Sequence, residues 1–595
     1  MKSMNASRRP SMSQDSKGLI LAILLIVWLQ LAVNHTAAQT NVLGPQPGTA
    51  PLQGIVDLHT HPMANLGFAG KLLHGGLDVG SLLPADANCN HNVRATSVEQ
   101  ALGSCNPTHG GWGLDNPCGD VIRNLVINQT QSNQKPAASG CGSRNGYPSF
   151  DSWPANNDIT HQCMWVDWIR RTYLGGLRVM VALAVNNKTL ADMVAGPGDG
   201  PDDDKTSADL QICELKMFVA RHSISSAPVG DVSNFMEVAY SSADLERIVR
   251  ANKLAVILGT EIDHIGNFGD ITVPGYVPTN QLSDAIIQNE IDRLYGEGVR
   301  YIFPIHMLDN AFGGASAYQD LMNYSNYRES GNWWNLMVVT NFTYNFSSQN
   351  GPTFDAGMLA KLGNVIFAPP TYPTVTGFTT NAGQIVTGLA NVQGLTSQGM
   401  VAIKEMMRRG IMIDIDHMSD LAKQQTIDLA QTVGYPLNSG HSSLRIFGGS
   451  GVNERSTSTN QYQAIVKLHG MAGVGTAGSD AYAWANAYAN VISVMGGWSS
   501  AACGFGTDAD GVSPLFKQRA NSSVQYNAAF PRCTLGTKTW DYNMDGVAHY
   551  GLLPDFLQDV QTDAADGGPL IYSNLMTGAN YLLQTWKICE AGGTL

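Results

Sequence analysis

The sequence predicts an α/β protein, a (β/α)8 TIM barrel with long loop insertions. Eight short β-rich runs follow one another along the 595 residues. Helical patterns lie between several of these runs, as expected for parallel strands joined by crossover helices. Histidine or carboxylate side chains end six of the eight runs. A doubly wound open sheet is the competing architecture, because it also alternates strands with helices.

Each predicted strand is a short, largely apolar run. The eight runs cover residues 55–61, 177–185, 254–263, 299–307, 410–418, 435–442, 470–476 and 501–508. Between the third and fourth runs, Ile287, Ile291 and Leu294 recur at the i, i+4, i+7 spacing of one helix face. A second stripe of this kind, before the fifth run, consists of Met400, Ile403 and Met407.

The connections between the predicted strands are uneven in length. Long insertions follow the first strand, at about 65–175, and the fourth strand, at about 308–395. Both are rich in glycine, asparagine, proline and aromatic residues. Since they follow the carboxyl ends of strands, we expect them to lie over the face where barrel enzymes keep their active sites. Residues 39–595 are thus predicted to form a single barrel domain with two insertions.

The first 38 residues have the pattern of a signal peptide. Lys2, Arg8, Arg9 and Lys17 precede an apolar run at 19–33, and small residues at 36–38 suit cleavage after Ala38. The run of 15 residues is shorter than the roughly 20 needed to cross a bilayer. The pattern predicts a secreted, extracellular protein with no stable membrane span after cleavage; an uncleaved anchor is the alternative.

Composition narrows the class of protein further. Only 14% of residues are charged and the net charge is −13, which argues against nucleic acid as a partner. Nine cysteines in a secreted chain predict disulfide bonds with one odd thiol. Six sequons beyond the signal region predict a glycoprotein; they begin at Asn128, Asn187, Asn323, Asn341, Asn345 and Asn521.

The end of the first predicted strand is the first candidate metal site. It reads Asp57-Leu58-His59-Thr60-His61. Two imidazoles two residues apart on a strand project to the same side and can reach one ion at the carboxyl end of a barrel strand. Two such histidines alone are a weak signal, so the prediction depends on whether other strands supply the remaining ligands.

Later strands end in further ligand-type residues. Glu261 follows a buried-looking apolar run, where a carboxylate is costly unless it is paired or metal-bound. His306, His417 and His441 end the fourth, fifth and sixth strands, and Asp508 ends the eighth. Individually, Glu261 could be a solvated strand end and His306 a hydrogen-bonded core histidine. Their joint occurrence around the barrel predicts a metal site.

Several of these motifs resemble the membrane dipeptidase (renal dipeptidase-like) family of the amidohydrolase superfamily. The resemblance is carried by Gly-Leu-Thr-Ser-Gln-Gly at 394–399 with Ile-Asp-Ile-Asp-His-Met-Ser at 413–419, Ser-Gly-His-Ser-Ser at 439–443, Gly-Thr-Asp-Ala-Asp-Gly at 506–511 and Leu-Met-Thr-Gly-Ala-Asn at 575–580. It is best over about 394–585 and patchy over 54–63 and 254–310. The two insertions have no counterpart in shorter family members.

The resemblance implies a barrel of amidohydrolase type with two divalent metal ions, zinc being the expected metal. His59, His61 and Asp508 would hold one ion, and His417 and His441 the other. The remaining roles concern three residues. Glu261 would bridge the ions, His306 would face the substrate or its oxyanion, and Arg455 would bind a substrate carboxylate. A solvated loop arginine is the alternative for Arg455.

One position departs from the family pattern. The family has His-x-Asp in its first motif, whereas this chain has His59-Thr60-His61. A neutral ligand in place of an anionic one leaves more positive charge at the metals and should lower the pKa of bridging water. Asp57 shares the side of both histidines and is predicted to support them by a hydrogen bond.

The implied reaction is hydrolysis of a peptide or related amide bond by a metal-bridging hydroxide, with a small peptide or amide as substrate. Asp508 would take the proton of the nucleophile and pass it to the leaving amine. Lactones and N-acyl amino acids are alternative substrates, and a homodimer stays open. A histidinol-phosphatase-like phosphoesterase shares the Asp-Leu-His-Thr-His opening and is a rival interpretation of the site. A non-catalytic secreted metal-binding protein is a further rival.

Overall fold

The structure is a computed structural model. It describes residues 44–84, 93–105, 145–151, 153–194, 198–318, 320–339, 370, 372, 388–445, 453–475, 478–562 and 567–594. The predicted signal peptide lies outside these residues. In the part of the chain that is described, no helix is both long and apolar enough to cross a membrane.

Eight parallel strands close into a barrel. Around it they run in the order β1 (Ile55–Thr60), β2 (Leu177–Asn186), β4 (Leu254–Ile262), β5 (Tyr301–Ile302), β8 (Met412–Asp414), β9 (Leu437–Ser442), β10 (Ala472–Gly475) and β11 (Cys503–Gly506). The last strand pairs with the first, Phe505 opposite Asp57, so the sheet has no open edge here. Every predicted strand overlaps one of these eight. The barrel prediction is therefore confirmed, and the open-sheet alternative is wrong.

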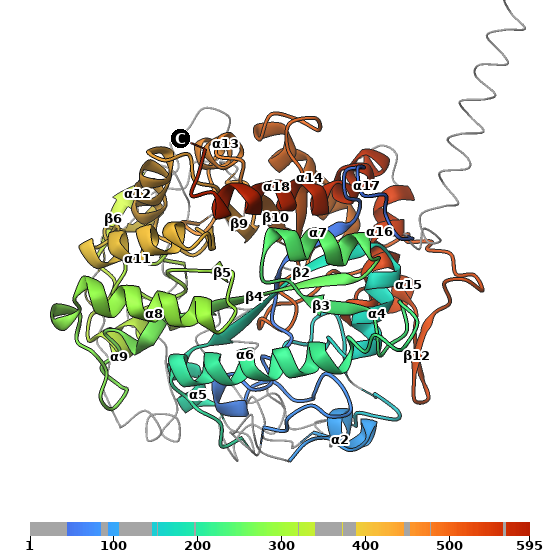
Figure 1. The fold of residues 1–595 in the computed structure, drawn as a ribbon. Coiled ribbons are helices and arrows are strands. Elements are labelled where there is room, and N and C mark those ends of the chain that lie inside the picture. Colours follow the sequence, from blue (N-terminus) through green and yellow to red (C-terminus); the bar gives the residue numbers. More distant parts are fainter. Residues whose placement is uncertain are drawn as a thin grey trace, which may run out of the picture.

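Helices surround the barrel, as Figure 1 shows for α6, α7, α8, α11 and α18. The connecting helices are α4 (Val166–Leu174), α5 (Lys188–Met193), α6 (Asp204–Arg221), α7 (Ser242–Arg250), α8 (Asp284–Gly296), α9 (Asp320–Ser330), α11 (Ser397–Arg408), α12 (Asp420–Gln431), α13 (Thr459–Lys467) and α14 (Ala481–Val494). After β11 come α15 (Tyr542–Asp545), α16 (Leu553–Thr562), α17 (Gly568–Met576) and α18 (Gly578–Glu590). Ser283, Thr396, Ser419 and Ser458 cap four of them by accepting a backbone N–H.

The strand sequences explain why they form the core. All ten residues of β2 and all nine of β4 are buried, as expected for parallel strands covered on both faces. In α8 the predicted stripe of Ile287, Ile291 and Leu294 is buried. The second predicted stripe is only partly right, because Met400 of α11 is exposed.

Five short strands were not predicted. Strand β3 (Met236–Val238) adds a ninth strand to the sheet by pairing with the start of β4. Strands β6 (Leu336–Val339) and β7 (Gly388–Asn391) form an antiparallel pair within the second insertion. A second pair, β12 (Cys533–Leu535) and β13 (Lys538–Trp540), follows β11. Runs this short give no usable periodicity.

Described parts of both insertions contact the carboxyl ends of the strands. From the first insertion, Gln162 donates a hydrogen bond to the carbonyl oxygen of Pro62, just after β1. From the second, the amide of Ser316 donates to the carbonyl oxygen of His417. The described parts of the first insertion include a short turn of helix (Phe68–Gly70) and α2 (Val98–Leu102). The insertions thus contact the loops that carry the candidate ligands.

The disulfide prediction needs correction. Cys163, Cys503, Cys533 and Cys589 are free thiols, so more than one thiol is unpaired. Cys213 is disulfide-bonded. Cys503 lies in β11 and Cys589 in α18, and both are buried. Three of the other predicted partners, at positions 89, 118 and 141, lie outside the described residues.

Two predicted glycosylation sites are also excluded by burial. Asn187 caps α5 and is 1% exposed, and its amide donates to Asp263. Asn323 is 3% exposed and donates to the hydroxyl of Tyr372. Neither side chain can carry a glycan in the folded protein, whereas Asn521 is exposed.

Candidate metal centre

Strand β1 delivers the first two ligand-type side chains to the barrel mouth. His59 and His61 are fully buried, and their Nε2 atoms lie 2.9 Å apart. The other ring nitrogen of His61 lies 3.3 Å from the carbonyl oxygen of Leu183. When Nδ1 carries the proton, Nε2 has a free lone pair on the side of Glu261. A histidine binds a metal ion in this state.

Asp57 supports this motif through the backbone rather than through the imidazoles. Its carboxylate accepts the amide of His59 at 3.2 Å and the hydroxyls of Thr507 and Tyr550 at 2.7 and 2.9 Å. These bonds tie β1 to the loop after β11, where Asp508 stands. Asp57 is thus a hydrogen-bond partner of this motif, as predicted, through the backbone amide of His59. Burial raises the pKa of Asp57 to about 6, although its hydrogen bonds oppose the rise.

Glu261 lies between the two predicted halves of the site. Its Oε2 lies 2.9 Å from Nε2 of His59 and 3.1 Å from Nε2 of His61. Its Oε1 lies 3.3 Å from Nε2 of His417 and 4.0 Å from Nε2 of His441. At 2% exposed, Glu261 is not a solvated strand end. One carboxylate that faces two histidine pairs with separate oxygens is the arrangement of a bridging ligand.

The carboxylate of Glu261 is held ionised by its surroundings. Burial alone would raise its pKa, but the histidines around it, His59 and His306 foremost, hold the pKa well below its usual range. A buried carboxylate in this state needs compensating positive charge.

His417 and His441 form the second histidine pair. Their Nε2 atoms are 2.8 Å apart, and the ring of His441 stacks on that of His59 with centroids 3.8 Å apart. His417 has a φ of 65°, uncommon for a residue with a Cβ and frequent where backbone strain serves a site. The strand that carries His441 also lies very close to β11. A Cβ on Gly506 would lie 2.2 Å from the carbonyl oxygen of Gly440, so glycine is needed at position 506.

Asp416 orients His441 and was not among the predicted site residues. Its carboxylate accepts the backbone amide of His441 at 2.8 Å and the hydroxyl of Ser439 at 2.6 Å, and lies 3.2 Å from Nδ1 of His441. A carboxylate behind a metal-binding histidine fixes its ring and raises its basicity. The sequence offered one sign of this role: Asp416 directly precedes the candidate ligand His417, so it lies at the same strand end.

Asp508 completes the first group. Its Oδ1 lies 3.3 Å from Nε2 of His61 and 3.6 Å from Nε2 of His59. Its side chain is 18% exposed, compared with 3% for Glu261 and 0–1% for the two histidines. Its φ of 53° is again in the left-handed region. Asp508 is thus the member of this group that solvent reaches most readily.

His306 stands beside the second group. Its Nε2 lies 3.7 Å from Oε1 of Glu261, and its Nδ1 lies 3.2 Å from Asp263. Burial opposes ionisation, yet Glu261 and Asp263 raise the pKa of His306. Asp263 is a second residue that sequence reasoning missed, two positions after Glu261. Because the rings of His306 and His417 meet edge to face at 4.8 Å, His306 is also close enough to act as a ligand.

The ring of Tyr318 lies between Arg455 and His417. Its guanidinium carbon is 5.4 Å from the ring centroid of Tyr318, and that ring is 6.2 Å from the ring of His417. Tyr318 belongs to the second insertion and was not predicted from the sequence, where nothing marks it out. The half-buried Arg455 therefore contacts Tyr318, a neighbour of His417.

The residues present fit two metal ions. His59, His61 and Asp508 form one group, Glu261, His306 and His417 another, and His59, Glu261 and His441 a third, with one ligand atom of each residue within 4.8 Å of the others. Donors that share a zinc ion at about 2.0–2.1 Å lie roughly 3 Å apart. Imidazole lone pairs 2.8 and 2.9 Å apart repel one another unless protons or cations separate them.

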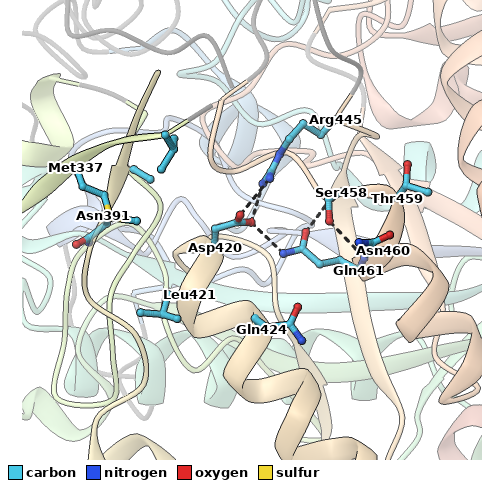
Figure 2. A pocket seen from close by; sticks show the side chains of 12 residues that line it. Met337, Asn391, Asp420, Leu421, Gln424, Arg445, Ser458, Thr459, Asn460 and Gln461 are labelled. Carbon is cyan, nitrogen blue, oxygen red and sulfur yellow. Dashed lines mark hydrogen bonds and ion pairs between the residues drawn. The ribbon is translucent and has the colours of Figure 1, made fainter. Parts of the chain in front are cut away.

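A separate hollow of about 570 Å³ does not contain these residues. It lies beside α12 and α13 and the β6–β7 pair (Figure 2). Its charged groups are already matched, since Arg445 donates to Asp420 at 2.8 Å and Gln461 donates to the same oxygen at 2.9 Å. The reactive chemistry therefore belongs to the barrel mouth.

No family model and no curated protein matches this chain. Solved structures that resemble it include an amidohydrolase from Pseudomonas aeruginosa, 12% identical over 71% of this chain and 92% of that one, with a TM-score of 0.38. A metallopeptidase named dipeptidase AC is 12% identical over 70% and 88%, with a TM-score of 0.39. A metallopeptidase from Rhodobacter sphaeroides, bound to a phosphinate mimic of L-Ala-D-Ala, is 14% identical over 70% and 88%, with a TM-score of 0.37. Likeness at this level does not bear on the reaction, which must be argued from the side chains.

Proposed function

We propose that this protein is a secreted metal-dependent hydrolase with two divalent ions, a dipeptidase-like amidohydrolase that cleaves a peptide or related amide bond. The proposal rests on the position of the Glu261 carboxylate between the two histidine pairs. One of its oxygens faces His59 and His61, and the other faces His417 and His441. The nitrogen and oxygen donors favour zinc. Secretion is supported by the signal-like first 38 residues.

The bound ions would supply an acidified water and a polarised carbonyl group. Asp508, partly exposed and beside His61, takes the proton of the attacking water and returns it to the leaving amine. His306, whose pKa is raised by Glu261 and Asp263, donates from Nε2 to the developing oxyanion.

Arg455 would set the preference for substrates with a free carboxylate. Its guanidinium lies over Tyr318, on the side of the site near His417. A bidentate bond from the guanidinium to a terminal carboxylate would favour dipeptides over longer chains or amides. Because His61 is a neutral ligand, the ligands around the first ion carry less negative charge than they would with a carboxylate at this position. Lactones and N-acyl amino acids therefore belong in any substrate panel.

The test is elemental analysis of the purified protein together with a hydrolysis panel of dipeptides, N-acyl amino acids, lactones and phosphate esters. We expect at least two divalent ions per chain and hydrolysis of dipeptides, lost on chelation and restored by Zn²⁺. Turnover of phosphate esters alone would favour the phosphoesterase alternative. A fully loaded protein that hydrolyses none of these substrates would favour a non-catalytic metal-binding protein.

A further inference from the structure

A second buried cluster of ligand-type side chains lies where the loop after β4 meets α9. It consists of His264, Asp270 and Glu329, which are 1%, 0% and 0% exposed. One ligand atom of each lies within 4.8 Å of the others. None of the three belongs to the groups around Glu261 at the barrel mouth.

Hydrogen bonds fix both carboxylates through one oxygen only. Oε1 of Glu329 accepts the amide and hydroxyl of Thr189 at 2.9 and 2.5 Å and the hydroxyl of Ser325 at 3.0 Å. Oδ1 of Asp270 accepts the amide and hydroxyl of Thr272 at 2.9 and 2.6 Å. Among the described residues, Oε2 of Glu329 and Oδ2 of Asp270 have no hydrogen-bond partner. Leaving such a buried oxygen unsatisfied is costly.

His264 is fixed in the same one-sided way. Its Nδ1 lies 3.2 Å from the carbonyl oxygen of Phe268, to which it can only donate. The other ring nitrogen, Nε2, faces Oε2 of Glu329, 3.5 Å away. Nε2 makes no hydrogen bond within the described structure. A lone pair that faces a carboxylate oxygen is repelled by it, and a cation between the two turns the repulsion into attraction.

The charge of the cluster matches a divalent ion. Two carboxylates and a neutral imidazole carry two negative charges. Burial, and then the charge of Asp270, raise the pKa of Glu329 to about 7, which shows how costly two bare carboxylates are here. The adjacent basic side chain, Arg328, pairs instead with Asp192. An imidazole ligand favours zinc or another first-row transition metal over calcium or magnesium.

We propose that His264, Asp270 and Glu329 bind one divalent transition-metal ion as a structural site separate from the catalytic centre. The ion fastens the second insertion to the strand that supplies Glu261. Backbone contacts agree with this role, because the amide of Ile271 donates to the carbonyl oxygen of Glu329 at 2.8 Å. The same loop contains Asp263, which orients His306.

The first test counts ions in the full-length protein after equilibration with Zn²⁺ and removal of excess metal. Glu329→Gln and Asp270→Asn keep the shape of each side chain and should each lower the content by one ion per chain relative to wild type. Glu454→Gln is the matched control: it is equally buried, but both its oxygens accept backbone amides. It should retain the full content. Equal metal in wild type and both site variants would overturn the proposal.

This difference of one ion is independent of the proposed function. His59→Ala lowers metal at the barrel mouth, and the further loss caused by Glu329→Gln should remain one ion in that background. If the variants fail to fold, anomalous diffraction at the zinc edge from the wild-type protein answers instead. A peak among His264, Asp270 and Glu329 supports the site, and its absence at full zinc loading overturns it. A site that Ca²⁺ fills and Zn²⁺ does not would overturn the choice of metal.

Discussion

Asp508 has two roles in the proposed mechanism, as a ligand of the first ion and as the group that transfers the proton. Asp508→Asn removes the proton acceptor but leaves His59, His61 and Glu261 around the first ion. We expect kcat to fall about 10²–10⁴-fold, the usual contribution of a general acid–base group, while most of the metal is retained. Steady-state kinetics with elemental analysis of the same sample checks this. Near-normal activity at full metal content would remove Asp508 from the mechanism.

Asp510→Asn is the matched control for that variant. Asp510 is also buried, but its carboxylate accepts the amide of Cys163 at 3.0 Å and belongs to none of the ligand groups at the barrel mouth. Its effect on kcat should be small. A comparable loss in both variants would point to distortion of the loop after β11.

Arg455 is tested by the carboxylate of the substrate. Arg455→Met should lower kcat/KM for dipeptides about 10–100-fold, mainly through KM, because a charge-assisted hydrogen bond is worth about 1.5–3 kcal/mol. The same substitution should leave hydrolysis of a C-terminally amidated dipeptide nearly unchanged. Loss on both substrates to the same degree would mean that Arg455 supports the loop rather than the substrate.

At the scale of elements, the site depends on how the strand ends are joined. Asp416 follows β8 and holds the backbone and ring of His441 at the end of β9. Asp57 joins β1 to the loop after β11 by accepting the amide of His59 and the hydroxyl of Thr507. Each carboxylate joins two neighbouring barrel strands where a ligand emerges. The ligand positions are therefore set by strand-to-strand hydrogen bonds.

Asp416→Asn tests this coupling. The amide keeps the volume but weakens the bonds to His441, so metal affinity should fall about 10–100-fold, as for other residues behind a metal ligand. Activity at saturating Zn²⁺ should recover much of the wild-type value. Zn²⁺ titration monitored by activity and by competition with a chelator checks both points. Ser439→Ala, which removes only one bond to Asp416, should have a smaller effect on affinity.

At the scale of the whole molecule, the sequence predicted the barrel because its strands are short apolar runs, six of which end in ligand-type residues. All eight strands and the meeting of the predicted ligands around Glu261 agree with the structure. Strand β3 was missed because three residues show no period. Tyr318 was missed because its place near His417 depends on how an insertion folds back, which local patterns do not determine.

A buried carboxyl group in the second insertion, that of Asp309, makes the stability of the protein depend on pH. Burial raises the pKa of Asp309 to about 7, against bonds from Ala315 and Asn391 that would lower it. The folded protein therefore binds this proton more tightly than the unfolded chain. The resulting stabilisation is complete below about pH 4 and is lost as the pH rises through 7. In Asp309→Asn the amide oxygen can keep both bonds without titrating. Relative to wild type, the variant should gain about 4 kcal/mol between pH 4 and 8, because the pKa of Asp309 differs by about three units between the folded and unfolded chain. Denaturant unfolding at each pH measures this gain. A constant difference between the two proteins across this range would show that Asp309 does not titrate in the folded state.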